Sequence, residues 1–123
     1  MDRKQYEAYL IDFYGITPDH PFEDDDDTVV FRHSDNKKWF ALVMNIPAAR
    51  LGLGDGHIDV VNLKCDQEII TSLWDGEGIF PAYHMNKAHW ISVVLDGRVD
   101  GHTLEWLTKI SYGLTAKKMA KKI

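Results

Sequence analysis

The stretch IDVVNLKCDQEIITSLWD, residues 58–75, changes its hydrophobic pattern halfway along and so contains two different elements. Residues 58–65 are rich in β-branched side chains, which favour a strand whose successive side chains point to opposite faces. After Asp66, an expected N-cap, the apolar residues recur at helical spacing. The stretch therefore predicts a strand and then a short helix over 66–75, with four side chains facing inward, namely Ile69, Ile70, Leu73 and Trp74.

The residues before this stretch predict a helix and a hairpin. Asp2 and Gln5 resemble a capping box, and helical spacing of apolar residues up to Gly15 predicts a helix over 3–14. TVVFRH (28–33) and WFALVMN (39–45) flank a polar turn, which is the signal of a β-hairpin.

Two irregular segments separate these elements. GITPDHPFEDDDD, residues 15–27, combines two prolines with a run of five acidic residues, which favours an exposed loop over a cation site. IPAARLGLGDGH, residues 46–57, has alternating glycines but neither phosphate-loop nor dinucleotide spacing. We interpret the second segment as a mobile hairpin arm, or wing.

The residues after the opening stretch predict a second hairpin and a last helix. IFPAYHM (79–85) and HWISVVLD (89–96) are strand-like and are joined by a short connection. The last helix is expected to turn Leu104, Leu107, Ile110 and Leu114 inward and to end in the basic residues Lys117, Lys118, Lys121 and Lys122.

The predicted fold class is α+β, with one domain over residues 1–123 and element order α-β-β-β-α-β-β-α. Strands joined by short turns favour an antiparallel sheet, here of five strands. Three amphipathic helices can cover one face of it, which gives two layers and leaves the other face at least partly open.

Strand alternation predicts which polar side chains share that open face. Val61, Leu63 and Cys65 are expected in the core, so Asn62 and Lys64 face the other way. By the same alternation Trp90 and Ser92 lie on the open face, where the residues AYHMNKAHW (82–90) add further polar groups. The candidate ligand or nucleic-acid contacts are Asn62, Lys64, His84, Asn86, Lys87, His89 and Trp90.

Such a surface would suit a planar or anionic ligand, because it combines cations, amides and aromatic area. The alternative is structural: Trp90 would pin the face, the histidines would satisfy backbone groups, and Asn86 would adopt an awkward turn conformation.

Composition and spacing favour a non-enzymatic protein of the cytoplasm without metal or cofactor. His84 and His89 lack a third ligand at zinc-like spacing, and no carboxylates pair for acid–base work. Cys65 is the single cysteine and is expected to be buried with a raised pKa. No segment resembles a signal peptide or a membrane span.

Charge is uneven along the chain. Residues 1–62 hold 6 Lys and Arg against 12 Asp and Glu, and residues 63–123 hold 8 against 7, within a net charge of −5. This balance opposes bulk electrostatic coating of nucleic acid but leaves room for a local basic face.

The sequence resembles the MmcQ/YjbR family, whose members are described as predicted DNA-binding proteins. Gln67 stands where that family typically has proline. The resemblance covers nearly the whole chain and rests on VNLKCDQE (61–68), PAYHMNKAHWISVVLDG (81–97), ISYGLT (110–115), HPF (20–22) and KKWFALV (37–43). Its signature falls on Asn62, Leu63, Lys64, Cys65, Asp66, Tyr83, His84, Met85, Asn86, Lys87, His89 and Trp90.

The resemblance implies a fold related to type III secretion chaperones and a "double wing" contact with DNA through hairpins. Three hypotheses follow: a DNA-binding or regulatory module, a chaperone-like protein-interaction module, and a small-molecule-binding protein or enzyme. The expected partners are DNA or another protein, with no membrane, for a chain that is a monomer or a weak homodimer.

Overall fold

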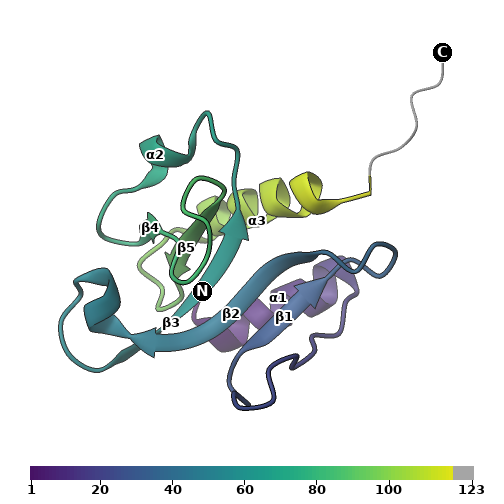
Figure 1. The fold of residues 1–123 in the computed structure, drawn as a ribbon, viewed down its shortest axis with the longest axis horizontal. Helices are drawn as coiled ribbons and strands as arrows, with labels where there is room; N and C mark the ends of the chain where they lie inside the picture. The colour runs from purple at the N-terminus through teal and green to yellow at the C-terminus, as the bar shows by residue number, and fades with distance from the viewer. Residues whose placement is uncertain (118–123) are drawn as a thin grey trace.

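Five antiparallel strands form one sheet of order β1-β2-β3-β5-β4 in the computed structural model, which describes residues 1–117 (Figure 1). The strands are β1 (Val29–Arg32), β2 (Trp39–Pro47), β3 (His57–Lys64), β4 (Ile79–Pro81) and β5 (Trp90–Val94). The helices are α1 (Arg3–Tyr14), the 3-10 helix η1 (Ala48–Leu51), α2 (Ile70–Leu73) and α3 (Gly101–Thr115). The predicted α+β class, element order and sheet are confirmed.

The two long helices cover one face of the sheet, as Figure 1 shows from the opposite side, with α1 and α3 behind the strands. The predicted capping box is present, since the Asp2 carboxylate accepts the Gln5 N–H and the Gln5 side chain accepts the Asp2 N–H. Inside the helix layer, the Tyr6 hydroxyl lies 2.8 Å from that of Thr108, and both residues are fully buried. This contact joins α1 to α3 within the main core.

The predicted helix over 66–75 is shorter than expected. Only Ile70–Leu73 is helical, and the N-cap position is Ile69 rather than Asp66. The Asp66 carboxylate accepts the N–H of Glu68 instead, which closes a local turn before the helix begins. The four apolar side chains nevertheless pack against the core as expected.

The predicted strand over 79–85 ends at Pro81, and the chain then leaves the sheet. From Ala82 to His89 it forms a loop, which we call the 82–89 loop. The N–H and the carbonyl of Tyr83 are both taken by side chains of neighbouring strands, so they are not available to extend the ladder.

The last helix turns a partly polar face toward the sheet. Leu104 and Leu107 are buried as predicted and Ile110 is half-buried, but Leu114 is 42% exposed, so its predicted inward position is wrong. Ser111 faces inward instead, and its hydroxyl donates to the Phe40 carbonyl and accepts the Lys64 N–H. The helix therefore supplies partners for backbone groups that β2 and β3 leave unpaired at this end.

The glycine-rich arm is the connection between β2 and β3. The backbone turns through η1 and through Gly52, which has a φ of 71° in the left-handed region that favours glycine. Leu51 and Leu53 pack onto a second apolar cluster on the helix-free face. That cluster consists of Val30, Leu42, Met44, Ile46, Val60 and Val94.

Within residues 1–117, none of the helices has both the length and the apolar character required to cross a bilayer.

Candidate functional site

Lys64 and Trp90 are direct partners in the ladder between β3 and β5. Their neighbours Leu63 and Ile91 belong to the core beneath the helices, so strand alternation places Lys64 and Trp90 on the helix-free face. Both residues are half-buried. The two side chains predicted to emerge together are therefore neighbours at the end of the sheet.

Asn62 and Ser92 lie on the same face but are fully buried, so the expectation that they belong to an open surface is wrong. The Ser92 hydroxyl donates to the Asn62 carboxamide oxygen at 2.5 Å and accepts the Tyr83 N–H. The Asn62 amide donates to the Tyr83 carbonyl at 2.8 Å. Asn62 therefore holds the 82–89 loop and offers no free group to a ligand.

Three further candidates in the 82–89 loop, His84, Asn86 and Lys87, are exposed, and two of them also form hydrogen bonds within the loop. The Asn86 side chain accepts the Ala88 N–H, and Lys87 donates from Nζ to the Ala82 carbonyl at 2.8 Å. The residue with a left-handed backbone is His84, at a φ of 57°, and not Asn86 as the structural alternative expected. The His84 ring stacks on that of Tyr83 with centroids 3.9 Å apart, and His84 remains exposed.

His89 and Cys65 lie where the loop rejoins the sheet. The His89 carbonyl accepts the Cys65 N–H at 2.7 Å, and the His89 ring lies 3.3 Å from the side-chain nitrogen of Gln67. Cys65 is a buried free thiol, and burial raises its pKa, in agreement with the sequence analysis.

The arm between β2 and β3 brings a further cation to this face. Arg50 and Lys87 together line a surface depression of about 330 Å³, along with Leu51 and Pro81. Both cationic residues are exposed. Arg50 was not among the residues predicted from the sequence, because nothing in the arm's composition fixes its direction.

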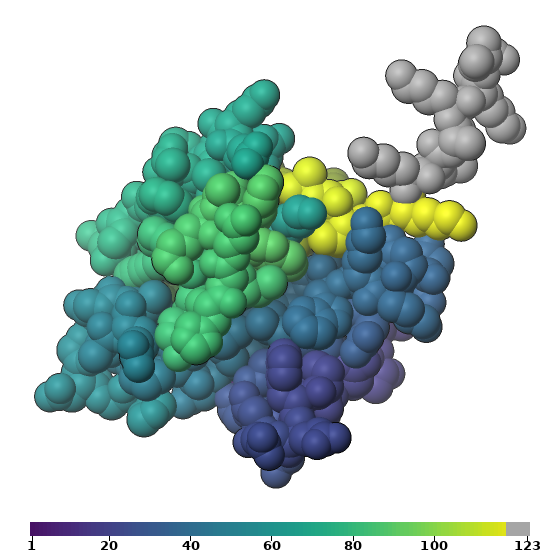
Figure 2. Space-filling view, viewed as in Figure 1, coloured from purple at the N-terminus to yellow at the C-terminus, as the bar shows by residue number. Residues whose placement is uncertain are grey.

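A groove on the helix-free face was also missed. Its floor is the outward row of β2, formed by Leu42, Met44 and Ile46, and its volume is about 590 Å³. Figure 2 shows the 82–89 loop, in green, lying over the sheet, with the loop between α1 and β1 (residues 15–28, called the acidic loop), in indigo, below it. We call this feature the β2 groove, and the residues that line it are Phe22, Asp25, Thr28, Trp39, Leu42, Met44, Asn45, Ile46, Pro47, Tyr83, His84 and Met85.

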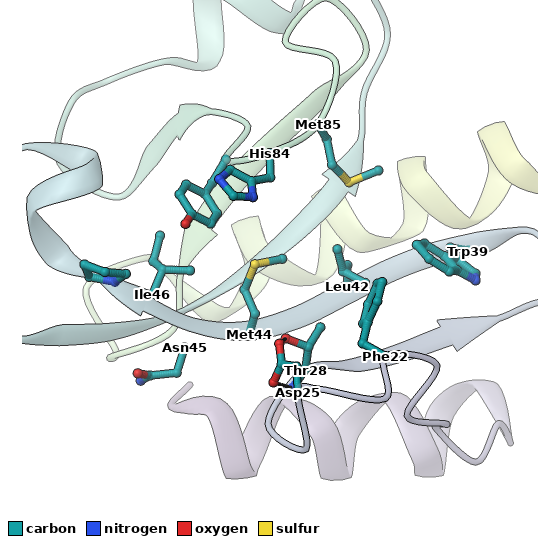
Figure 3. A pocket seen from close by; sticks show the side chains of 12 residues that line it. Phe22, Asp25, Thr28, Trp39, Leu42, Met44, Asn45, Ile46, His84 and Met85 are labelled. Carbon is teal, nitrogen blue, oxygen red and sulfur yellow. Dashed lines mark hydrogen bonds between the residues drawn. The ribbon is translucent and has the colours of Figure 1, made fainter.

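Two loops form the opposite walls of the β2 groove (Figure 3). Phe22, Asp25 and Thr28 come from the acidic loop, and His84 and Met85 come from the 82–89 loop. The rings of Phe22 and Trp39 meet edge to face, with centroids 5.8 Å apart. The one feature of the sequence that hints at this groove is Phe22, a large apolar residue within an otherwise polar and acidic loop, and it does not by itself reveal which residues lie opposite.

Over residues 1–117, no group of three or more His, Cys, Asp or Glu side chains is arranged to hold a metal ion. Of the four basic residues predicted at the end of the last helix, Lys117 is exposed. Lys118, Lys121 and Lys122 lie outside the described residues.

Comparison with known proteins gives relatives that match most of the chain. The chain is 45% identical over 97 residues to the uncharacterized protein YyaQ of Bacillus subtilis, covering 78% of this chain and 82% of that one. A crystal structure of a Pseudomonas syringae protein matches at a TM-score of 0.91 and 47% identity, over 94% of this chain and all of the other. The Deinococcus radiodurans protein DR2400 matches at a TM-score of 0.63 and 32% identity, over 87% of this chain and 72% of that one.

The family resemblance noted in the sequence is confirmed by a direct match. The YjbR family model covers residues 11–114, which include every strand, the buried Asn62 and the whole 82–89 loop. On this match and the similarity to YyaQ, the chain belongs to the YjbR family.

Proposed function

We propose that this protein binds DNA, without catalysis, through the end of the sheet that carries Lys64 and Trp90. The observation that carries the proposal is the register pairing of these two residues on the helix-free face. A lysine beside an indole offers an ammonium group for a phosphate and a flat apolar surface for a sugar or base.

Other lysines gather at the same end of the molecule. Lys37 and Lys38 lie in the turn between β1 and β2, and the Asn36 amide ties that turn to the Thr115 carbonyl at the end of α3. Lys117 lies just beyond the end of α3, separated from it by Ala116. In the described part of the chain, no ion pair involves Lys37, Lys38 or Lys64, so their charges are available to phosphates.

The opposite end of the sheet is acidic, which gives the molecule a charge polarity. There Arg3 pairs with Asp27 at 2.8 Å and with Asp59 at 3.5 Å, and the rest of the acidic run adjoins Asp27. A polyanion would be repelled by that end, whereas at the other end Lys37, Lys38, Lys64 and Lys117 outnumber the acidic residues Asp35, Asp66 and Glu68. The polarity supports a local contact in a protein whose net charge is −5.

A second pair of basic side chains on the same face agrees with the expectation that a hairpin arm contacts DNA. Arg50 of the arm and Lys87 of the 82–89 loop line one depression. Two separated basic points could hold the backbone of a duplex at two positions, each by neutralising phosphates.

Fluorescence anisotropy with a labelled duplex and a labelled single strand tests the proposal at low salt and at roughly 0.15 M salt. We expect Lys64→Gln to weaken binding and to reduce the log–log salt slope by about 0.9 for each phosphate that the variant fails to neutralise. Lys109→Gln is the matched control, because Lys109 is an exposed lysine of α3 in the helix layer. Absence of binding at low salt, or equal weakening in the two variants, would refute the proposal.

A protein-interaction role is the second candidate, and it is favoured by a different surface. Trp106 is 49% exposed and Leu114 42% exposed, and with Ile110 they form an apolar stripe at four-residue spacing on α3. The stripe would fit a second copy of α3 packed antiparallel about Ile110, because Trp106 of each copy would then face Leu114 of the other.

Light scattering after size exclusion tests this self-association. We expect a dimer at high protein concentration that Trp106→Lys abolishes, whereas Phe13→Lys, at a 69% exposed position of α1, leaves it intact. A monomer at all concentrations would remove this candidate.

A further inference from the structure

The β2 groove has the dimensions of a small-molecule site and is separate from the proposed DNA contact. Its volume of about 590 Å³ lies within the usual range for sites that enclose a small organic molecule. None of Lys64, Trp90, Arg50 and Lys87 lines it. Its floor is well ordered by packing, since Leu42, Met44 and Ile46 belong to the second apolar cluster.

The rings that line the β2 groove suit a positively charged group. Phe22 is 39% exposed although it is a large apolar side chain, and it meets Trp39 edge to face. Tyr83 presents a further ring from the facing wall. The face of an aromatic ring attracts a cation, most strongly where water is partly excluded.

The two methionines broaden the shapes that the groove can take. Met44 lies on the floor and Met85 on the wall formed by the 82–89 loop (Figure 3). A thioether is polarizable and has several rotatable bonds, so it adapts to an apolar or aromatic body. These residues therefore favour a ligand with an apolar part as well as a charge.

The charge around the β2 groove is negative. Asp25 lines it, and hydrogen bonds from the Thr28 hydroxyl and from the backbone N–H groups of Thr28 and Asp27 lower the pKa of its carboxyl. Among residues 1–117, no lysine or arginine lines the groove, although His84 does. Arg3 of α1, which contacts the acidic loop at Asp27, is held by Glu7 and Asp27. An anionic ligand would thus meet the repulsion of the Asp25 carboxylate, with the ring N–H of His84 as a hydrogen-bond donor but without the permanent charge of a lysine or arginine in the described lining.

We propose that the β2 groove binds a small organic cation, an ammonium or guanidinium group carried on an aromatic or branched apolar body. The apolar body would lie on Met44 and Leu42, and the cationic group would lie between the Phe22 and Trp39 rings and the Asp25 carboxylate. The site is walled by two loops and is too small for a folded partner, which favours a small molecule over a protein surface.

Three probes of equal shape and different charge test the proposal: 2-naphthylmethylammonium, 2-naphthylmethanol and 2-naphthoate. Their binding is measured by titration calorimetry and by chemical-shift changes of backbone amides. We expect the ammonium to bind about tenfold more tightly than the carboxylate, with the alcohol between them. The shifted amides should lie in residues 22–28, 42–46 and 83–85.

Variants outside the core locate the site. Phe22→Ala should weaken ammonium binding several-fold, and Asp24→Asn with Asp26→Asn should do the same without touching the Asp25 hydrogen bonds. Phe13→Ala is the matched control, since Phe13 is exposed on α1 at the helix side. Preference for the carboxylate, shifts outside the three segments, or equal weakening in Phe22→Ala and Phe13→Ala would overturn the proposal. Binding of a lysine-rich peptide without binding of the free ammonium would overturn it in favour of a peptide site.

Discussion

The side-chain amide of Asn62 donates a hydrogen bond of 2.8 Å to the backbone carbonyl of Tyr83. Ser92 completes the arrangement, because its hydroxyl donates to Asn62 and accepts the Tyr83 N–H. A loop that would otherwise leave two backbone groups unpaired over an apolar sheet is thereby fixed in place. Tyr83, His84 and Met85 are in turn positioned as one wall of the β2 groove.

Replacement of Asn62 by alanine is expected to destabilise the protein by roughly 2–3 kcal/mol. The substitution leaves the Ser92 hydroxyl and the Tyr83 carbonyl without their partner inside the protein, and buried unpaired groups cost about 1–3 kcal/mol each. Urea unfolding followed by tryptophan fluorescence measures the destabilisation. Asn45→Ala is the control. The side-chain amide of Asn45 donates a hydrogen bond to the Asp59 carboxylate, but this hydrogen bond is exposed and should contribute less than about 1 kcal/mol. Equal destabilisation in the two variants would contradict the assignment.

Ser111 links the helix layer to the neighbouring strands β2 and β3. Its hydroxyl donates to the Phe40 carbonyl at 2.6 Å and accepts the Lys64 N–H at 2.9 Å. Ser111→Ala should therefore cost about 1–3 kcal/mol of unfolding free energy, because two backbone groups are left without their partner. Thermal unfolding is a suitable measurement. Ser72→Ala, on the exposed surface of α2, should change the stability by no more than about 0.5 kcal/mol, and a comparable destabilisation there would exclude a specific role for Ser111.

The strands could be predicted from sequence because their signal is local. Alternation of apolar and polar residues placed Leu63 and Ile91 in the core and Lys64 with Trp90 on the other face, as the register confirms. Two helix predictions were less successful. The helix predicted over 66–75 extends only over Ile70–Leu73. The spacing of Leu114 predicted a core residue, but Leu114 is exposed and Ser111 faces inward. The Ser111 hydroxyl forms hydrogen bonds with the Phe40 carbonyl and the Lys64 N–H, and these two backbone groups come together only in the assembled sheet.

The candidate site shows the same limit. Strand alternation gave the correct face for Asn62 but not its burial, because the covering 82–89 loop depends on bonds across 21 and 9 positions of sequence. The β2 groove could not be predicted, since its lining comes from three segments whose proximity follows from the strand order.

The Cys65 thiol should resist modification in the folded protein. It is 2% exposed, and burial raises its pKa, so little reactive thiolate is present at neutral pH. We expect a disulfide reagent such as Ellman's reagent to label the thiol slowly under native conditions and within seconds to minutes in denaturant. Labelling that is fast in the native state would show that the end of β3 opens readily.

Asp75 should make the stability of the protein depend on pH in the acidic range. Partial burial raises the pKa of its carboxyl, but hydrogen bonds from the N–H groups of Ile79, Gly78 and Glu77 outweigh this and hold the pKa below its ordinary value. A carboxyl with a lowered pKa in the folded state stabilises fully above its unfolded pKa, and this contribution is lost as the pH falls through the folded value.

We therefore expect wild type to exceed Asp75→Asn in unfolding free energy by about 1 kcal/mol at neutral pH, with a difference that shrinks below about pH 4. Urea unfolding at neutral pH and at several acidic pH values measures the difference. Asp12→Asn corrects for the general effect of removing one negative charge, because Asp12 is exposed on α1. A difference that stays constant on acidification, after this correction, would mean that the charge on Asp75 does not stabilise the turn before β4.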